Sequence, residues 1–274
     1  MNRIDALFTR LRREGRRALM PFITAGDPDL ATTKALLTEL VARGAHMVEI
    51  GIPYSDPIAD GPVISASYHR ALVKGVRLED IFQTLGEARA SAILAGAPLV
   101  TMVSYAIIHR TGAEHYIEQA VKAGVDGLIV PDLPVEESEA LLRMATTAGL
   151  KLIQLVTPTT PRDRAVRIAR ATSGFLYYVS VAGITGERRA LPPELAENVA
   201  WLRTQTPLPL CIGFGISSPE HVRALAPVAD GLIVGSALVR RLADAQGQSV
   251  VPEIGRFVAE LASALDDSRL ESRD

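Results

Sequence analysis

The pentapeptide Asp126-Gly127-Leu128-Ile129-Val130 occurs a second time in this chain, at residues 230–234. In each copy an acid and a glycine precede an apolar run, the pattern of a strand covered on both faces of a parallel sheet. The chain contains eight such runs, and the two copies are the fourth and the eighth. A repeat at this interval is typical of two equivalent halves of a closed barrel, although five shared residues can also arise by chance.

The eight runs alternate with segments of helical periodicity, in which apolar residues recur at spacings of three and four. The predicted strands are residues 18–24, 46–52, 98–104, 125–130, 151–156, 174–181, 208–214 and 229–234. Strict alternation predicts parallel strands joined by helical crossovers. We therefore expect an α/β fold, a single (β/α)₈ TIM barrel domain over residues 1–274, with a short extra helix after the eighth strand and a frayed tail at 266–274. The alternative is an open doubly wound sheet, but no G-x-G-x-x-G turn follows the first strand.

Composition excludes several classes of function. The 274 residues are 48% hydrophobic and carry a formal net charge of −2, which leaves no basic footprint for nucleic acid or for a membrane surface. No apolar stretch is long enough to span a bilayer, and charges throughout residues 1–17 leave no room for a signal peptide, so we expect a cytoplasmic protein. A single cysteine, Cys211, and histidines without metal-binding spacing predict no intrachain disulfide and no catalytic metal.

Barrel enzymes of this class carry their active site at the carboxyl ends of the strands, which directs attention to Glu49. Period-two alternation places Glu49 on the face opposite to Val48, Ile50 and Ile52, so its carboxyl group points into the barrel. A carboxylate shielded from water there has a raised pKa, which suits proton transfer near neutral pH. The structural alternative is an ion pair with a basic barrel residue such as Lys151.

The loop after this strand holds two further acids, Asp56 and Asp60, on a segment stiffened by prolines. Either carboxylate can accept a hydrogen bond from a substrate N–H or O–H group. Because Asp56 precedes a proline and Asp60 precedes a glycine, both also fit ordinary turns. Spacing alone leaves the two interpretations open.

Glycines late in the chain indicate a phosphate site. Gly213-Phe214-Gly215 ends the seventh predicted strand, and Gly235-Ser236 ends the eighth and opens the short helix. Loops at these two strands often bind phosphate in barrels, through bare backbone N–H groups and a helix N-terminus. The glycine-hinged segment 182–190 is typical of a lid that excludes water.

These motifs resemble the α subunit of tryptophan synthase over nearly the full chain. The matching segments are Arg3-Ile4-Asp5, PFITAGDP at 21–28, VEIGIPYSDPIADGP at 48–62, GVDGLIVPDLPVEES at 124–138, residues 183–186, GFGISSP at 213–219 and GSAL at 235–238. The resemblance implies a TIM barrel that cleaves indole-3-glycerol phosphate to indole and glyceraldehyde 3-phosphate without a cofactor. It also implies a β-subunit partner in an α₂β₂ heterotetramer, within tryptophan biosynthesis.

The resemblance also assigns roles to residues. Glu49 corresponds to the family's general acid and base, and Asp60 to the carboxylate that accepts the indole N–H. It places Thr185 in the closing lid and gives the phosphate to Gly186, Gly215, Gly235 and Ser236, while Phe22, Tyr177 and Phe214 line the rest of the substrate. The surface facing the partner includes Pro53, Asp56 and Pro57.

Two departures from the family pattern keep alternatives open. Ser65 stands where the family has glutamine, and the asparagine usual after Tyr105 is absent from a shortened loop at 105–110. Because that loop resembles part of the β-facing surface, a free-standing lyase that releases indole without a β partner is an alternative. A catalytically idle regulatory subunit is a third possibility, and the intact pair Glu49 and Asp60 argues against it.

Overall fold

The computed structural model describes residues 1–57, 60–179, 193–213, 215–245 and 250–267. Its strands form one parallel sheet in the order β5-β4-β3-β2-β1-β9-β8-β7-β6. The strands are β1 (Ala18–Thr24), β2 (Val48–Gly51), β3 (Leu99–Met102), β4 (Gly127–Ile129), β5 (Lys151–Ile153), β6 (Leu155–Val156), β7 (Leu176–Val179), β8 (Leu210–Gly213) and β9 (Gly231–Val234). Every predicted strand therefore has a counterpart.

The two ends of this sheet meet at Gln154, which closes the barrel. β5 pairs with β4, and β6 pairs with β7, so the fifth predicted strand is present but interrupted at one residue. The carbonyl of Gln154 accepts a hydrogen bond from the Tyr177 amide at 3.1 Å, which carries the pairing across the interruption. The predicted (β/α)₈ barrel is confirmed.

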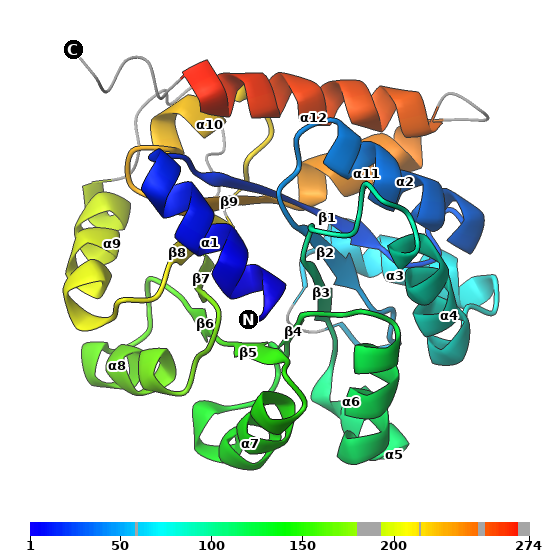
Figure 1. The fold of residues 1–274 in the computed structure, drawn as a ribbon, viewed down its shortest axis with the longest axis horizontal. Coiled ribbons are helices and arrows are strands. Elements are labelled where there is room, and N and C mark those ends of the chain that lie inside the picture. The colour runs from blue at the N-terminus through cyan, green and yellow to red at the C-terminus, as the bar shows by residue number, and fades with distance from the viewer. Residues whose placement is uncertain (58–59, 180–192, 214, 246–249, 268–274) are drawn as a thin grey trace.

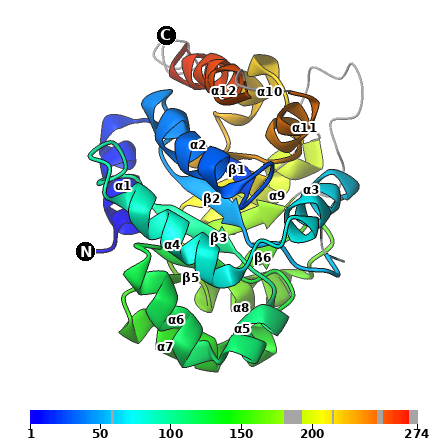
Figure 2. The same ribbon diagram turned by 90° about the vertical axis from the view of Figure 1, so that its right-hand side faces the viewer.

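Helices surround the barrel, as Figures 1 and 2 show. They are α1 (Arg3–Glu14), α2 (Leu30–Ala42), α3 (Pro62–Val73), α4 (Leu78–Arg89), α5 (Tyr105–Thr111), α6 (Ala113–Lys122), α7 (Glu139–Thr147), α8 (Arg162–Arg170), α9 (Pro193–Gln205), α10 (Pro219–Leu225), α11 (Ser236–Asp244) and α12 (Val250–Asp267), with a 3₁₀ turn η1 (Val135–Glu137). α11 is the predicted extra helix after the last strand. The predicted frayed tail begins inside α12, and residues 268–274 lie outside the described part of the chain.

The core has two layers because strand residues alternate between the faces of the sheet. Val48, Ile50 and Ile52 belong to the outer layer, between the sheet and the helices, whereas Met47 belongs to the inner layer. Cys211 is fully buried in the inner layer, and burial raises the pKa of its thiol. No helix in the described segments is long and apolar enough to cross a membrane.

Helix α1 covers the amino-terminal end of the barrel (Figure 1). Its residues Ile4, Leu7, Phe8 and Leu11 pack into the inner core layer beneath the strands. The side chain of Asn2 caps this helix by accepting a hydrogen bond from the Ile4 amide at 2.8 Å. The barrel is therefore filled at its amino-terminal end, and the space for a ligand lies at its carboxyl-terminal end.

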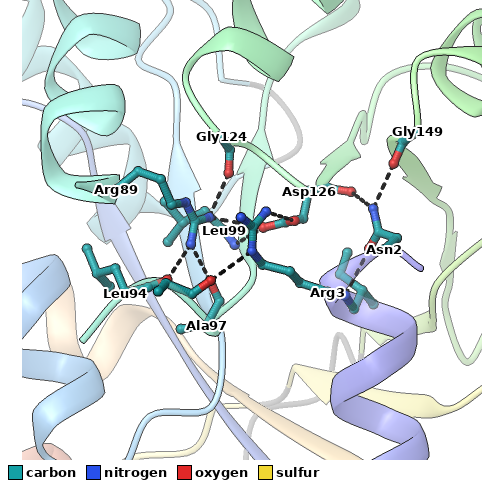
Figure 3. Close-up of polar contacts among 11 residues, drawn as sticks. Asn2, Arg3, Arg89, Leu94, Ala97, Leu99, Gly124, Asp126 and Gly149 are labelled. Carbon is teal, nitrogen blue, oxygen red and sulfur yellow. Dashed lines mark hydrogen bonds and ion pairs between the residues drawn. The ribbon is translucent and has the colours of Figure 1, made fainter. Parts of the chain in front are cut away.

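At the amino-terminal end, the buried carboxylate of Asp126 joins three segments (Figure 3). It accepts hydrogen bonds from Arg3 at 2.9 Å, from Arg89 at 3.0 Å and from the Leu99 amide at 2.9 Å. The guanidinium of Arg89 also donates to the carbonyl of Gly124 at 2.6 Å.

The second copy of the pentapeptide repeats this arrangement. Asp230 accepts hydrogen bonds from Arg203 at 2.9 Å and from the Leu210 amide at 2.9 Å. Arg203 also donates to the carbonyl of Val228, two residues before the aspartate, as Gly124 is two residues before Asp126. The shared pentapeptide thus marks equivalent positions in β4 and β9, as a repeat of half-barrels predicts.

Candidate active site

A cavity of about 680 Å³ opens at the carboxyl ends of the strands. Every predicted catalytic or substrate-binding residue within the described segments lines it: Phe22, Glu49, Asp60, Tyr177, Gly215, Gly235 and Ser236. These residues come from five different strands or the loops that follow them, so only the folded barrel brings them together.

Glu49 lies at the base of this cavity and is almost fully buried, with 1% of its surface exposed. Strand pairing sets it beside Phe22 of β1 and Val100 of β3. Among the described residues, neither of its carboxylate oxygens has a hydrogen-bond or ion-pair partner, and Lys151 pairs instead with Asp5, so the alternative of an ion pair with Lys151 is wrong. Burial, aided by the nearby charge of Asp60, raises the pKa of Glu49 to about 8.

Asp60 is partly buried, and its carboxylate accepts a hydrogen bond from the Tyr54 hydroxyl at 3.3 Å. Burial raises the pKa of Asp60, while the hydrogen bond from Tyr54 acts in the opposite direction and the charge of Asp132 raises it further. The two cavity acids thus differ in environment: one has no polar partner, and the other has a phenol that favours its charged form.

Aromatic side chains form the wall beside Glu49. Phe22 and Tyr177 are both buried and both line the cavity. Of the two adjacent tyrosines of β7, Tyr177 points inward, whereas Tyr178 joins the outer core layer and accepts a hydrogen bond from Asn198. Adjacent residues of a strand point to opposite faces, so only one of the two tyrosines can face the cavity.

The predicted phosphate site lies on the rim of the same cavity. Gly215 adopts a φ of +42°, which favours glycine, and Ser236 begins α11 and is exposed. Gly235 has a φ of −104° and a ψ of −92°. A side-chain carbon added there would meet only Phe22, at 3.9 Å, so its α-carbon borders space that a ligand can approach closely.

Three predicted site residues, Thr185, Gly186 and Phe214, lie outside the described residues, as does the whole predicted lid at 182–190. In the predicted partner surface, Asp56 is exposed, Pro57 is partly exposed and Pro53 is buried behind them.

The two departures from the family pattern have simple local structures. The Ser65 hydroxyl donates to the carbonyl of Gly61 at 3.1 Å, so it turns back on the start of α3. Residues 105–110 belong to α5, and Asp132 accepts hydrogen bonds from the Tyr105 amide at 2.8 Å and the Ser104 hydroxyl at 2.6 Å. Asp132 therefore caps a helix that precedes it in the chain.

Several lining residues were not predicted. Met102, Leu155 and Val179 face the cavity from β3, β6 and β7, and period-two alternation along those strands would have found them. Arg240 lines the cavity from α11. Its signal in the sequence is its place four residues after Ser236, on the same face of the short helix.

Comparison with known proteins places this geometry in a family. A sequence model of the family described as "Tryptophan synthase alpha chain" matches residues 8–265. A tryptophan synthase alpha chain from Rhodopirellula baltica is 53% identical, over 97% of this chain and 99% of that protein. A tryptophan synthase alpha chain from a Synechococcus species is 47% identical, over 94% of this chain and 96% of that protein.

Solved structures agree. A tryptophan synthase alpha chain from Legionella pneumophila superposes with a TM-score of 0.88 at 36% identity, over 97% of this chain and 98% of that chain. A chain of tryptophan synthase from M. tuberculosis superposes with a TM-score of 0.85 at 30% identity, over 97% of this chain and 100% of that chain. Family model, relatives and structures all cover nearly the full length, and the chain belongs to the tryptophan synthase alpha chain family.

Proposed function

We propose that this protein cleaves indole-3-glycerol phosphate to indole and glyceraldehyde 3-phosphate, as a carbon–carbon lyase. The observation that carries the proposal is Glu49: a buried carboxyl group with no hydrogen-bond partner in the described part of the chain, inside a cavity that also holds Asp60 and the glycine rim. An unpaired buried acid is costly to the fold, and such groups concentrate where proton transfer is needed.

The chemistry requires one group that both gives and takes a proton. With its pKa raised to about 8, Glu49 is largely protonated near neutral pH and can protonate indole C3. The resulting carboxylate then removes the proton of the adjacent side-chain hydroxyl. The electrons of that O–H bond then form the C=O bond of the aldehyde. The bond between indole C3 and the side chain breaks, and its electrons return to the indole ring. Glu49 has given one proton and taken one, so it ends the reaction protonated, as it began.

Asp60 has a separate role in this proposal. The ring becomes cationic once C3 is protonated, and an ionised carboxylate at the indole N–H stabilises that charge. The hydrogen bond from Tyr54 favours the ionised form of Asp60 against the effect of its burial. Two acids held in different environments can thus divide proton transfer and charge stabilisation between them.

For the partner, we infer a tryptophan synthase β subunit bound at the face that carries Asp56 and Pro57. Membership of the family supports this inference, and the exposure of Asp56 fits a contact there. No observation favours a free-standing lyase, and the intact pair Glu49 and Asp60 does not suit an idle regulatory subunit.

The deciding experiment measures indole release from indole-3-glycerol phosphate by the purified protein, with and without a tryptophan synthase β subunit. We expect slow release alone and faster release with the partner. Strong release that the β subunit does not change would favour the free-standing lyase. No release in either condition would overturn the proposed reaction.

A further inference from the structure

The cavity has an uneven distribution of charge. Two acids, Glu49 and Asp60, line it, and the substrate of the proposed function would add a phosphate of about −1.5 to −2 charges near neutral pH. Bare backbone N–H groups at the glycine rim supply partial positive charge only. Among the described lining residues, the single basic side chain is Arg240.

Helix geometry directs Arg240 toward the rim. It lies one turn after Ser236, and side chains at positions i and i+4 share a helix face. Because the Cα–Cβ bonds of a helix tilt toward its N-terminus, the Arg240 side chain leans back toward the turn that holds Gly235 and Ser236. Its presence in the cavity wall agrees with this direction.

Arg240 is also unengaged elsewhere. It is exposed, and within the described residues no hydrogen bond, ion pair or ring contact involves its guanidinium. The neighbouring Arg241 differs: its guanidinium stacks 4.1 Å from the centre of the Phe257 ring on α12, away from the cavity. Of these two adjacent arginines, Arg241 thus packs against another helix, whereas Arg240 faces the cavity.

We propose that Arg240 is a substrate-binding residue that supplies the charge-paired contact to the substrate phosphate, in addition to the backbone groups of the rim. This proposal rests on the proposed function. A guanidinium presents paired N–H donors whose geometry matches phosphate oxygens, and an otherwise unengaged arginine loses no existing contact when it binds.

The test compares Arg240→Gln with the matched control Arg241→Gln in steady-state cleavage of indole-3-glycerol phosphate. Because Arg240 is exposed, we expect Arg240→Gln to raise KM by about tenfold and to leave kcat within about twofold. Arg241→Gln should leave both constants within about twofold of the wild type. Arg240→Lys, which keeps the charge but not the paired donors, should raise KM less than Arg240→Gln does.

Two further measurements identify the phosphate as the contacted group. The dissociation constant for glycerol 3-phosphate should rise with Arg240→Gln by a factor similar to that of KM, and added salt should weaken binding more in the wild type than in this variant. With unphosphorylated indole-3-glycerol as substrate, the wild type and Arg240→Gln should give the same kcat/KM.

The outcomes separate this proposal from the proposed function. If the wild type releases no indole under any condition, the proposed reaction itself fails. If the wild type is active but Arg240→Gln leaves KM unchanged, or shifts KM only as much as Arg241→Gln does, the assignment of Arg240 is overturned while the reaction stands. Equal losses on the phosphorylated and unphosphorylated substrates would also overturn it.

Discussion

Asp126 and Glu49 are buried acids at opposite ends of one barrel, and their surroundings are opposite. Asp126 accepts hydrogen bonds from two arginines and a backbone amide (Figure 3). Glu49 accepts none. Burying a charged group stabilises a fold only when partners replace the lost water. The amino-terminal end is therefore built for stability, while the carboxyl-terminal end keeps an unpaired acid that stability alone does not explain.

The substitution Glu49→Gln tests this contrast most severely. Removing the proton donor should lower kcat by about 10³-fold or more, since general acid–base groups contribute about 10²–10⁴. The free energy of unfolding should stay the same or rise, because no hydrogen bond is lost. Steady-state kinetics and urea denaturation measure the two effects. A loss of stability comparable with the loss of activity would mean that Glu49 is a structural residue.

The substitution Asp126→Asn should give the reverse result. The amide group would turn N–H donors toward the guanidinium of Arg89, which is largely buried, so we expect a loss of about 3 kcal/mol in the free energy of unfolding. The kcat should change little. Denaturation and kinetics on the same preparation check this prediction.

The repeat provides a matched control in Asp230→Asn. Asp230 has one arginine partner, Arg203, and the side chain of Arg203 is 38% exposed. The substitution should therefore lower the free energy of unfolding by only about 1 kcal/mol. If the two substitutions lowered the free energy of unfolding equally, the number and burial of the arginine partners would not determine how much each aspartate stabilises the amino-terminal end of the barrel.

Stability should depend on pH through Glu49. Its pKa is raised from 4.5 to about 8, so the folded protein holds more protons than the unfolded chain between these values. The free energy of unfolding should therefore fall as pH rises through this window, by at most about 1.4 kcal/mol per pH unit from this group. Urea denaturation of the wild type and Glu49→Gln across the window measures the difference, and identical pH dependence in both would contradict the raised pKa.

A smaller effect is expected at Tyr54. Tyr54→Phe removes the hydrogen bond that favours the ionised form of Asp60, so the pKa of Asp60 should rise. The acid limb of the profile of kcat/KM against pH should then move to higher pH, with a loss of about threefold near neutrality. An unshifted acid limb in Tyr54→Phe would remove the tyrosine from this role.

Much of this contrast could be predicted from the sequence because it depends on alternation. The pattern of residues 46–52 alone put Glu49 inside the barrel and Val48 outside it, and the structure confirms both. Three features lay beyond such patterns. The interruption at Gln154 depends on pairing with distant strands, and the bond from Tyr54 to Asp60 depends on how the loop folds. Asp132 caps α5 through space, so its neighbours in the chain gave no indication of its partner.

Helix α1 also affects the exchange of molecules with solvent. Since its apolar side chains fill the base of the barrel, the described residues leave no route to the cavity through the amino-terminal end. Substrate then enters, and products leave, at the carboxyl-terminal end of the barrel. A product that has not yet left therefore stands in the path of the next substrate, so exchange at this end limits how quickly the cavity is refilled.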